Sequence, residues 1–165
     1  MGPMATQRTE RERLDDVVTV LGPDGRADPA LDPHLTADDA RRLQEAMLRA
    51  RVLDDRLTML QRQGRIAFHI GGTGEEATIV GAAFGLRATD WIFPCYREIA
   101  SALVRGTPLS LYLNNMFGNA EDPARGRQMP DHFTDRPRRW GSVSSPVGTQ
   151  IVQAAGFAWA AKLSG

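Results

Sequence analysis

The sequence predicts an α/β fold in which a parallel sheet of short strands is flanked by helices, and three observations support this. Short apolar segments bounded by turn residues occur at 65–70 and 91–94, with a third candidate at 141–144, as expected of buried strands. The segments between them carry apolar residues at spacings of three and four, which is typical of helices packed on a core. A glycine-rich turn also leads from the first apolar segment directly into one of these helices.

The composition is that of an ordinary globular chain and narrows the possible functions. Twenty basic and 20 acidic side chains balance among 165 residues, so we expect no nucleic-acid partner. No apolar run approaches the length of a membrane span, so we expect no membrane partner. Cys95 is the single cysteine, which excludes an internal disulfide and favours a reducing compartment. We therefore predict a cytoplasmic protein.

Residues 1–35 are predicted to form an extended arm outside the core. A brief apolar run at 17–21 indicates a short strand, and Gly-Pro-Asp-Gly follows at 22–25. Two Asp-Pro pairs come next, and turn residues this closely spaced leave no room for a long element. The domain itself is therefore expected to cover residues 36–165.

A long helix is predicted from Thr36 to just before Gly64. Thr36 suits the N-cap, and Asp39 completes a capping-box pattern. The helix carries a narrow apolar stripe suited to packing on a core or on another subunit, formed by Leu43, Ala46, Ala50, Leu53, Leu57 and Leu60. Shorter helices are expected over 75–86, 99–105, 107–117 and 150–162, with Pro108 at the first helical position of the third.

The turn G-G-T-G-E-E at 71–76 has two interpretations. With Ala77 it matches a loose G-x-G-x-x-A dinucleotide pattern, which on its own is a weak signal. That site also needs an acidic residue at the end of the next strand, where this sequence has Tyr96 and Arg97. We favour the second interpretation, in which the glycines allow a sharp turn and the two glutamates suit the positive end of a helix.

Tyr96 and Arg97 follow the apolar segment 91–94, at a predicted strand end where a helix begins. Ligands of open α/β sheets bind at such strand ends. A guanidinium presents a fixed fork of donors to phosphate or carboxylate groups, so an anion site is one interpretation. The other is that Arg97 pairs on the surface with Glu98 or another nearby carboxylate.

Two further segments carry polar groups suited to chemistry. The long loop at 120–142 contains His132, which is either a proton-transfer candidate or a solvated side chain. The following segment, 144–150, gathers hydroxyl and carbonyl oxygens ahead of a helix. Those oxygens either cap the helix or form a cage for a hard monovalent cation.

Several motifs in order resemble the α subunit of the E1 component of 2-oxo acid dehydrogenase complexes, a thiamine-diphosphate family. They are F-H-I-G-G-T-G-E-E-A at 68–77, D-W-I-F-P-C-Y-R-E at 90–98, G-R-Q-M-P-D-H at 126–132 and V-S-S-P-V-G-T-Q at 143–150. The G-R-Q-M-P-x-H form resembles the branched-chain (2-oxoisovalerate) type more than the pyruvate type.

The resemblance implies oxidative decarboxylation of branched-chain 2-oxo acids, with acyl transfer to the lipoyl domain of E2 and with an E1 β subunit as partner. One alternative is a pyruvate or acetoin dehydrogenase E1 α subunit. Others are a non-catalytic remnant or split-gene half that acts only in interactions, and a nicotinamide-dependent oxidoreductase based on the glycine turn.

The resemblance also implies roles for individual residues. Tyr96 and Arg97 would bind the cofactor diphosphate, while Ser145 and the backbone of Val147 would lie against thiamine diphosphate. Phe68 and Cys95 would line the acyl pocket, and His132 would be the catalytic residue near the substrate carboxylate. A potassium-type ion would be held by a set within the last motif: Ser144, Pro146, Thr149 and Gln150.

The resemblance runs over residues 36–165 and covers only the first part of the family's subunit. The turn that holds Mg²⁺ in the family, and a later catalytic histidine, have no counterpart in these residues. We therefore expect a truncated thiamine-diphosphate-binding domain, with an incomplete sheet flanked by helices. We also expect no Mg²⁺ ligands and no turnover by this chain alone.

Overall fold

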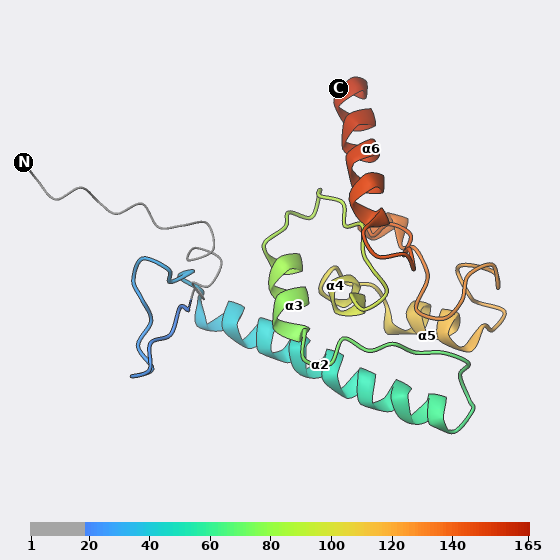
Figure 1. The fold of residues 1–165 in the computed structure, drawn as a ribbon, viewed down its shortest axis with the longest axis horizontal. Coiled ribbons are helices and arrows are strands. Elements are labelled where there is room, and N and C mark those ends of the chain that lie inside the picture. Colours follow the sequence, from blue (N-terminus) through green and yellow to red (C-terminus); the bar gives the residue numbers. More distant parts are fainter. Residues whose placement is uncertain (1–18) are drawn as a thin grey trace, which may run out of the picture. The chain divides into compact units, whose positions relative to one another are not determined.

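The computed structural model describes residues 19–165, which contain five α-helices and one short 3-10 helix (Figure 1). They are α2 (Ala37–Arg62), α3 (Glu76–Phe84), α4 (Ile99–Val104), α5 (Leu109–Phe117), η1 (Arg136–Arg138) and α6 (Thr149–Ser164). The chain divides into two compact units, with the boundary between Asp38 and Asp39. The helices expected from the sequence are therefore present, with ends shifted by a few residues.

The parallel sheet expected from the sequence is not present among residues 19–165, where no strand forms. Its only trace is a parallel bridge between Ile92 and Trp140, in which the N–H of Gly141 donates to the Ile92 carbonyl at 2.8 Å. The bridge cannot extend because Pro94 has no N–H and because Trp140 also pairs with Asp135 in an antiparallel bridge.

The segment 65–70, predicted as a strand, is a bend followed by chain without regular secondary structure. The N–H of Arg65 still bonds to the Leu60 carbonyl at the end of α2, at 2.9 Å. The N–H of Ile70 donates to the Asp131 carboxylate at 2.8 Å instead of to a neighbouring strand. A backbone carbonyl and a side-chain carboxylate thus occupy two N–H groups that a sheet would need.

Before α2, the described chain forms a short hairpin-like turn rather than a strand. Leu21 and Ala27 form an antiparallel bridge around Gly25, whose φ is +75°. The predicted strand at 17–21 lies partly outside the described residues, and its described end contributes only this bridge.

Helix α2 presents its apolar stripe to two groups of buried side chains. Its first half packs against α3 and α4, where Ala50 meets Ile79, Val80 and Ala100. Its second half, through Leu57, packs on a cluster that α4, α5 and the loop after α5 share. Burying a leucine of this kind contributes about 1.5–3 kcal/mol, so the stripe accounts for the helix as the sequence predicts.

The loop at 120–142 is part of the core. The rings of Phe133 and Trp140 lie 4.4 Å apart, and Tyr112 of α5 packs on Phe133 at 5.6 Å. The indole N–H of Trp140 donates to the Ser101 hydroxyl of α4 at 2.9 Å. These buried aromatic contacts hold the loop against α4 and α5.

Two helix starts differ from the sequence prediction. Pro108 precedes α5 with extended backbone, and the Thr107 hydroxyl donates to Asp135 at 2.7 Å instead of capping the helix. Gly148, with φ +92°, is the N-cap of α6 without a side-chain cap bond. No helix among residues 19–165 is long and apolar enough to cross a membrane.

Candidate functional site

Four side chains that the sequence singled out lie in one continuous row. The Arg97 guanidinium lies over the Tyr96 ring, 5.1 Å from its centroid, with Nη1 3.5 Å from the phenol oxygen. The Tyr96 ring stacks beside the His132 imidazole at 6.5 Å. On its other side, His132 Nε2 lies 2.5 Å from the Ser145 hydroxyl. The row joins the turn before α4, the loop after α5 and the segment before α6.

The turn that carries Tyr96 and Arg97 is held on both sides. Glu98 accepts a bond from the N–H of Cys95 at 2.9 Å, which closes the turn just before α4. Gly72 packs against the same turn so closely that a Cβ there would lie 2.8 Å from the Arg97 carbonyl oxygen. Glycine at position 72 is therefore required for this close approach of two backbone segments.

The hydrogen bonds of His132 fix which ring nitrogen carries the proton. Nδ1 lies 2.9 Å from the Pro130 carbonyl oxygen, which can only accept. Nδ1 therefore carries the hydrogen in the neutral ring, and Nε2 accepts from the Ser145 hydroxyl. This form of the ring presents a basic nitrogen next to an alcohol, an arrangement that can accept a proton.

Arg97 is exposed, and among residues 19–165 no carboxylate lies within ion-pair distance of it. The alternative in which Arg97 pairs with a neighbouring carboxylate has no such pair in this part of the chain. Glu98, its nearest candidate, accepts from the Cys95 N–H. Arg97 thus offers a positive charge and free donors to an anion from outside the chain.

Three other residues implied by the resemblance lie outside this row. Val147 is 81% exposed, so its side chain contacts little of the described chain. Phe68 and Cys95 are half-buried. Within residues 19–165, neither has a side-chain hydrogen bond or a ring contact with the row. Their place in an acyl pocket stays a prediction.

The oxygens at 144–150 gather as predicted but bind one another. The Ser144 and Thr149 hydroxyls are 2.6 Å apart, and Thr149 also donates to the Pro146 carbonyl at 2.9 Å. Gln150 points its amide nitrogen at the Ser144 carbonyl, 2.7 Å away. The donor set fits a monovalent cation at Ser144, Pro146 and Thr149, whereas the Gln150 side chain presents the wrong atom. In the described part of the chain, no three His, Cys, Asp or Glu side chains are grouped to hold a metal.

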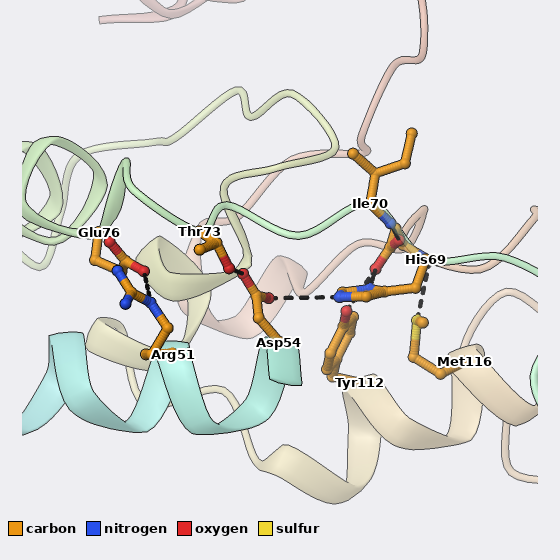
Figure 2. Close-up of polar contacts among 9 residues, drawn as sticks. Arg51, Asp54, His69, Ile70, Thr73, Glu76, Tyr112 and Met116 are labelled. Carbon is orange, nitrogen blue, oxygen red and sulfur yellow. Dashed lines mark hydrogen bonds and ion pairs between the residues drawn. The ribbon is translucent and has the colours of Figure 1, made fainter. Parts of the chain in front are cut away.

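A buried polar network that the sequence motifs did not reveal lies next to the row, and Figure 2 shows its contacts. His69 lies between two carboxylates, with Nδ1 3.3 Å from Asp131 and Nε2 3.5 Å from Asp54. The Tyr112 hydroxyl donates to Asp131 at 2.5 Å, and the Thr73 hydroxyl donates to Asp54 at 3.2 Å. The network therefore links α2, the glycine-rich turn, α5 and the loop at 120–142.

One signal in the sequence could have revealed this network. Asp54 lies four residues after Ala50 and three before Leu57, which places its carboxylate on the buried stripe of α2. A carboxylate on the buried face of a helix needs a partner, because an unpaired buried charge is costly. His69 is the partner that the structure provides.

The network changes the acid–base behaviour of its members. Burial disfavours the charged form of His69, but its contacts with the carboxylates of Asp131 and Asp54 outweigh burial and raise its pKa from 6.5 to about 9. Burial first, and then the charge of Asp131, raise the pKa of Tyr112 well above its usual value. At neutral pH His69 is thus a buried imidazolium between two carboxylates.

A separate ion pair holds the glycine-rich turn. Arg51 Nε of α2 lies 2.5 Å from Glu76 Oε1, and the other oxygen of Glu76 accepts from the Gly74 N–H at 3.0 Å. The Arg51 bond leads the lowering of the Glu76 pKa to about 2. The Gly74 N–H that a phosphate would use is thus occupied, which favours the structural interpretation of these glycines over a dinucleotide site.

The dehydrogenase E1 component family matches residues 44–165, and this chain belongs to that family of thiamine-diphosphate enzymes. Over 134 residues it is 42% identical to the α subunit of mitochondrial 2-oxoisovalerate dehydrogenase from Mus musculus and from Homo sapiens. The Caenorhabditis elegans protein of that name is 38% identical over 135 residues. These alignments cover 81–82% of this chain but only 30–31% of the relatives. The family resemblance drawn from the motifs is thus confirmed, and these relatives are branched-chain enzymes by name.

The comparison corrects one prediction. These relatives are mitochondrial by name, so the cytoplasmic location inferred from cysteine usage is wrong. The prediction failed because a single cysteine excludes an internal disulfide in any compartment. It therefore could not distinguish the cytoplasm from the mitochondrion.

Proposed function

We propose that this chain is part of the α subunit of a 2-oxoisovalerate dehydrogenase. The reaction is the oxidative decarboxylation of branched-chain 2-oxo acids, with transfer of the acyl group to lipoyl on E2. The observation that carries this proposal is the row Arg97–Tyr96–His132–Ser145, which brings three separate family motifs together. The names of the relatives favour this substrate class over pyruvate and acetoin, and over a non-catalytic remnant.

The row fits an anionic, ring-containing cofactor. Arg97 and the Tyr96 hydroxyl would hold the diphosphate, because they offer a charge and donors that no described carboxylate occupies. Ser145 and the Val147 backbone would lie against the rest of the cofactor. The chemistry that thiamine diphosphate supplies when bound is stabilisation of negative charge at the former carbonyl carbon.

The substrate would lie beside His132. With Nδ1–H fixed on Pro130, a proton taken up at Nε2 would make His132 a donor to the substrate carboxylate. Phe68 and Cys95 would line the pocket for the branched acyl group. The half-buried position of both side chains is compatible with an apolar wall.

We assign a potassium-type ion to the oxygens of Ser144, Pro146 and Thr149. Gln150 would join them only if its amide turned to present oxygen instead of nitrogen. Mg²⁺ would accompany the diphosphate, but no carboxylate cluster within residues 19–165 is placed to bind it. We therefore assign none of these residues to Mg²⁺.

The proposed partners are an E1 β subunit and the lipoyl domain of E2. The chain spans about 30% of the length of the curated relatives that it matches. Because an E1 β subunit is a proposed partner, activity is best tested with that subunit present. We also propose that residues 1–35 form an arm and that 36–165 belong to the cofactor-binding domain.

The test of this function is CO₂ release from 2-oxoisovalerate and from pyruvate, measured on the chain co-expressed with its E1 β subunit and supplied with thiamine diphosphate and Mg²⁺. The proposal predicts that any turnover favours 2-oxoisovalerate. A preference for pyruvate would contradict the substrate class. Turnover by this chain without a β subunit would contradict the proposed need for an E1 β partner.

A further inference from the structure

Asp131 adopts a backbone conformation that side-chain contacts maintain. Its φ is +66°, in the left-handed region that residues with a Cβ rarely occupy. Its side chain is 1% exposed, and its carboxylate accepts bonds from the Tyr112 hydroxyl and the Ile70 N–H at 2.5 and 2.8 Å. His69 Nδ1 adds a third contact at 3.3 Å. These contacts compensate for a conformation that would otherwise be unfavourable.

The backbone of Asp131 directly controls the surroundings of His132. It joins Pro130, whose carbonyl accepts from His132 Nδ1, to His132 itself. The N–H of His132 closes the same turn on the Met129 carbonyl at 3.1 Å. If Asp131 left the left-handed region, the Pro130 carbonyl and the imidazole would no longer face each other.

The contacts of Asp131 reach three other parts of the fold. Tyr112 belongs to α5, and His69 lies in the chain before the glycine-rich turn. His69 in turn contacts Asp54 of α2 at 3.5 Å. The turn that carries His132 is therefore tied to α5 and α2 through the buried carboxylate of Asp131. Figure 2 labels His69, Tyr112 and Asp54 among the residues of this network.

We propose that Asp131, held by His69 and Tyr112, is a positioning residue for His132. It keeps the imidazole in the form with hydrogen on Nδ1 and directs Nε2 at the Ser145 hydroxyl. The catalytic meaning of this role rests on the proposed function. The orientation of the ring does not, because no cofactor takes part in these contacts.

The test is ¹⁵N NMR of the histidine side chains in the full chain, which shows which ring nitrogen carries hydrogen. The chain has three histidines, so the resonances of His132 can be separated from those of His34 and His69. We would compare wild type with Asp131→Asn, which keeps the shape and tolerates positive φ but places an amide hydrogen against donors. Tyr112→Phe removes the hydroxyl that donates to Asp131 and keeps the ring. It is the alternative test variant if Asp131→Asn does not fold.

Asp122→Asn is the matched control. Asp122 is also a buried carboxylate of the same loop, and it accepts bonds from the N–H groups of Ala124 and Gly126 at 3.0 and 2.8 Å. It has no contact with the turn of His132 among its described hydrogen bonds. Its substitution tests whether any buried loop carboxylate has the same effect.

The proposal predicts that wild type and Asp122→Asn both show His132 with hydrogen on Nδ1. In Asp131→Asn, and in Tyr112→Phe to a smaller degree, this form should be lost to a mixture of both tautomers. An unchanged His132 spectrum in a folded Asp131→Asn or Tyr112→Phe chain would overturn the proposal, as would an equal change in Asp122→Asn. Absence of thiamine-diphosphate binding would count against the proposed function alone, since this readout needs no cofactor.

Discussion

The Nε2 atom of His132 lies 2.5 Å from the hydroxyl oxygen of Ser145, and this contact joins two family motifs that are separate in the sequence. The loop after α5 contributes the imidazole, and the segment before α6 contributes the alcohol. Their contact brings together two residues that the sequence motifs singled out, and their roles at a cofactor stay predictions.

Replacing Ser145 by alanine should affect the site more than the fold. Ser145 is exposed, so the free energy of unfolding should change by less than about 1 kcal/mol. Loss of the contact that the Ser145 hydroxyl would make with the cofactor, about 1 kcal/mol, should weaken thiamine-diphosphate binding about fivefold. Calorimetry with the β subunit present measures the binding, and the exposed Ser142→Ala is the control. Equal affinities in the two variants would contradict the place of Ser145 at the cofactor.

The buried imidazolium of His69 should make stability depend on pH. Its pKa is 6.5 when unfolded and about 9 when folded, between Asp54 and Asp131. The stabilisation is therefore fully present below pH 6.5 and is lost as pH rises through 9. The pKa difference sets a ceiling of about 3 kcal/mol on this loss.

Urea unfolding at pH 6 and at pH 9.5 measures this dependence. Tyr112, the other titratable side chain in direct contact with Asp131, stays neutral across this range because its pKa is raised well above its usual value. His69→Gln should remove most of the difference, whereas the exposed His34→Gln should leave it unchanged. A wild-type stability that is level between these two pH values would show that His69 is not charged in the folded chain.

The pair between Arg51 and Glu76 should contribute to acid stability. The pKa of Glu76 falls from 4.5 to about 2 on folding, so its contribution is present above pH 4.5 and is lost as pH falls toward 2. Solvent screens this pair because Arg51 is half-exposed, so Glu76→Gln should cost only about 1 kcal/mol at pH 7. Acid unfolding of Glu76→Gln should show a weaker pH dependence in this range than Glu45→Gln, which removes an exposed pair. Identical acid profiles would argue against the pair.

Gly72→Ala should disturb the Arg97 turn through steric contact. Its Cβ would lie 2.8 Å from the Arg97 carbonyl oxygen and 3.1 Å from Ile79 Cδ1, so we expect a loss of about 1–3 kcal/mol in unfolding free energy. Gly81→Ala in α3 is the control, because a Cβ there meets nothing within 4 Å and should stabilise the helix by about 0.5–1 kcal/mol. Thermal unfolding of both variants measures these changes in stability. An unchanged stability of Gly72→Ala would contradict the close approach of the two backbone segments.

The sequence predicted the helices well because their apolar spacing and terminal glycines are local signals. The stripe of α2 and the αL glycine after α5, Gly118, are both present. The sheet was predicted wrongly within the described residues, because short apolar segments become strands only if partners pair with them. Here Asp131 takes the Ile70 N–H, and Pro94 interrupts the other candidate.

The site was partly predictable for a similar reason. Motifs identified Tyr96, Arg97, His132 and Ser145, and the structure brings these four together. His69 is far in the sequence from both Asp54 and Asp131. The one local sequence signal for their pairing is an acidic residue, Asp54, on the apolar stripe of α2. The roles of the four motif residues stay predictions, as do those of Phe68, Cys95 and Val147.

The central claim is that Arg97 and its row bind thiamine diphosphate. Calorimetry with thiamine diphosphate, Mg²⁺ and K⁺, on the chain co-expressed with an E1 β subunit, tests it most directly. Loss of a charge-assisted bond of about 1.5–3 kcal/mol predicts at least tenfold weaker binding by Arg97→Ala. Arg49→Ala, which removes an exposed arginine of α2, should bind like wild type. Equal binding by wild type and Arg97→Ala, or no binding by folded wild type with its partner, would contradict the account.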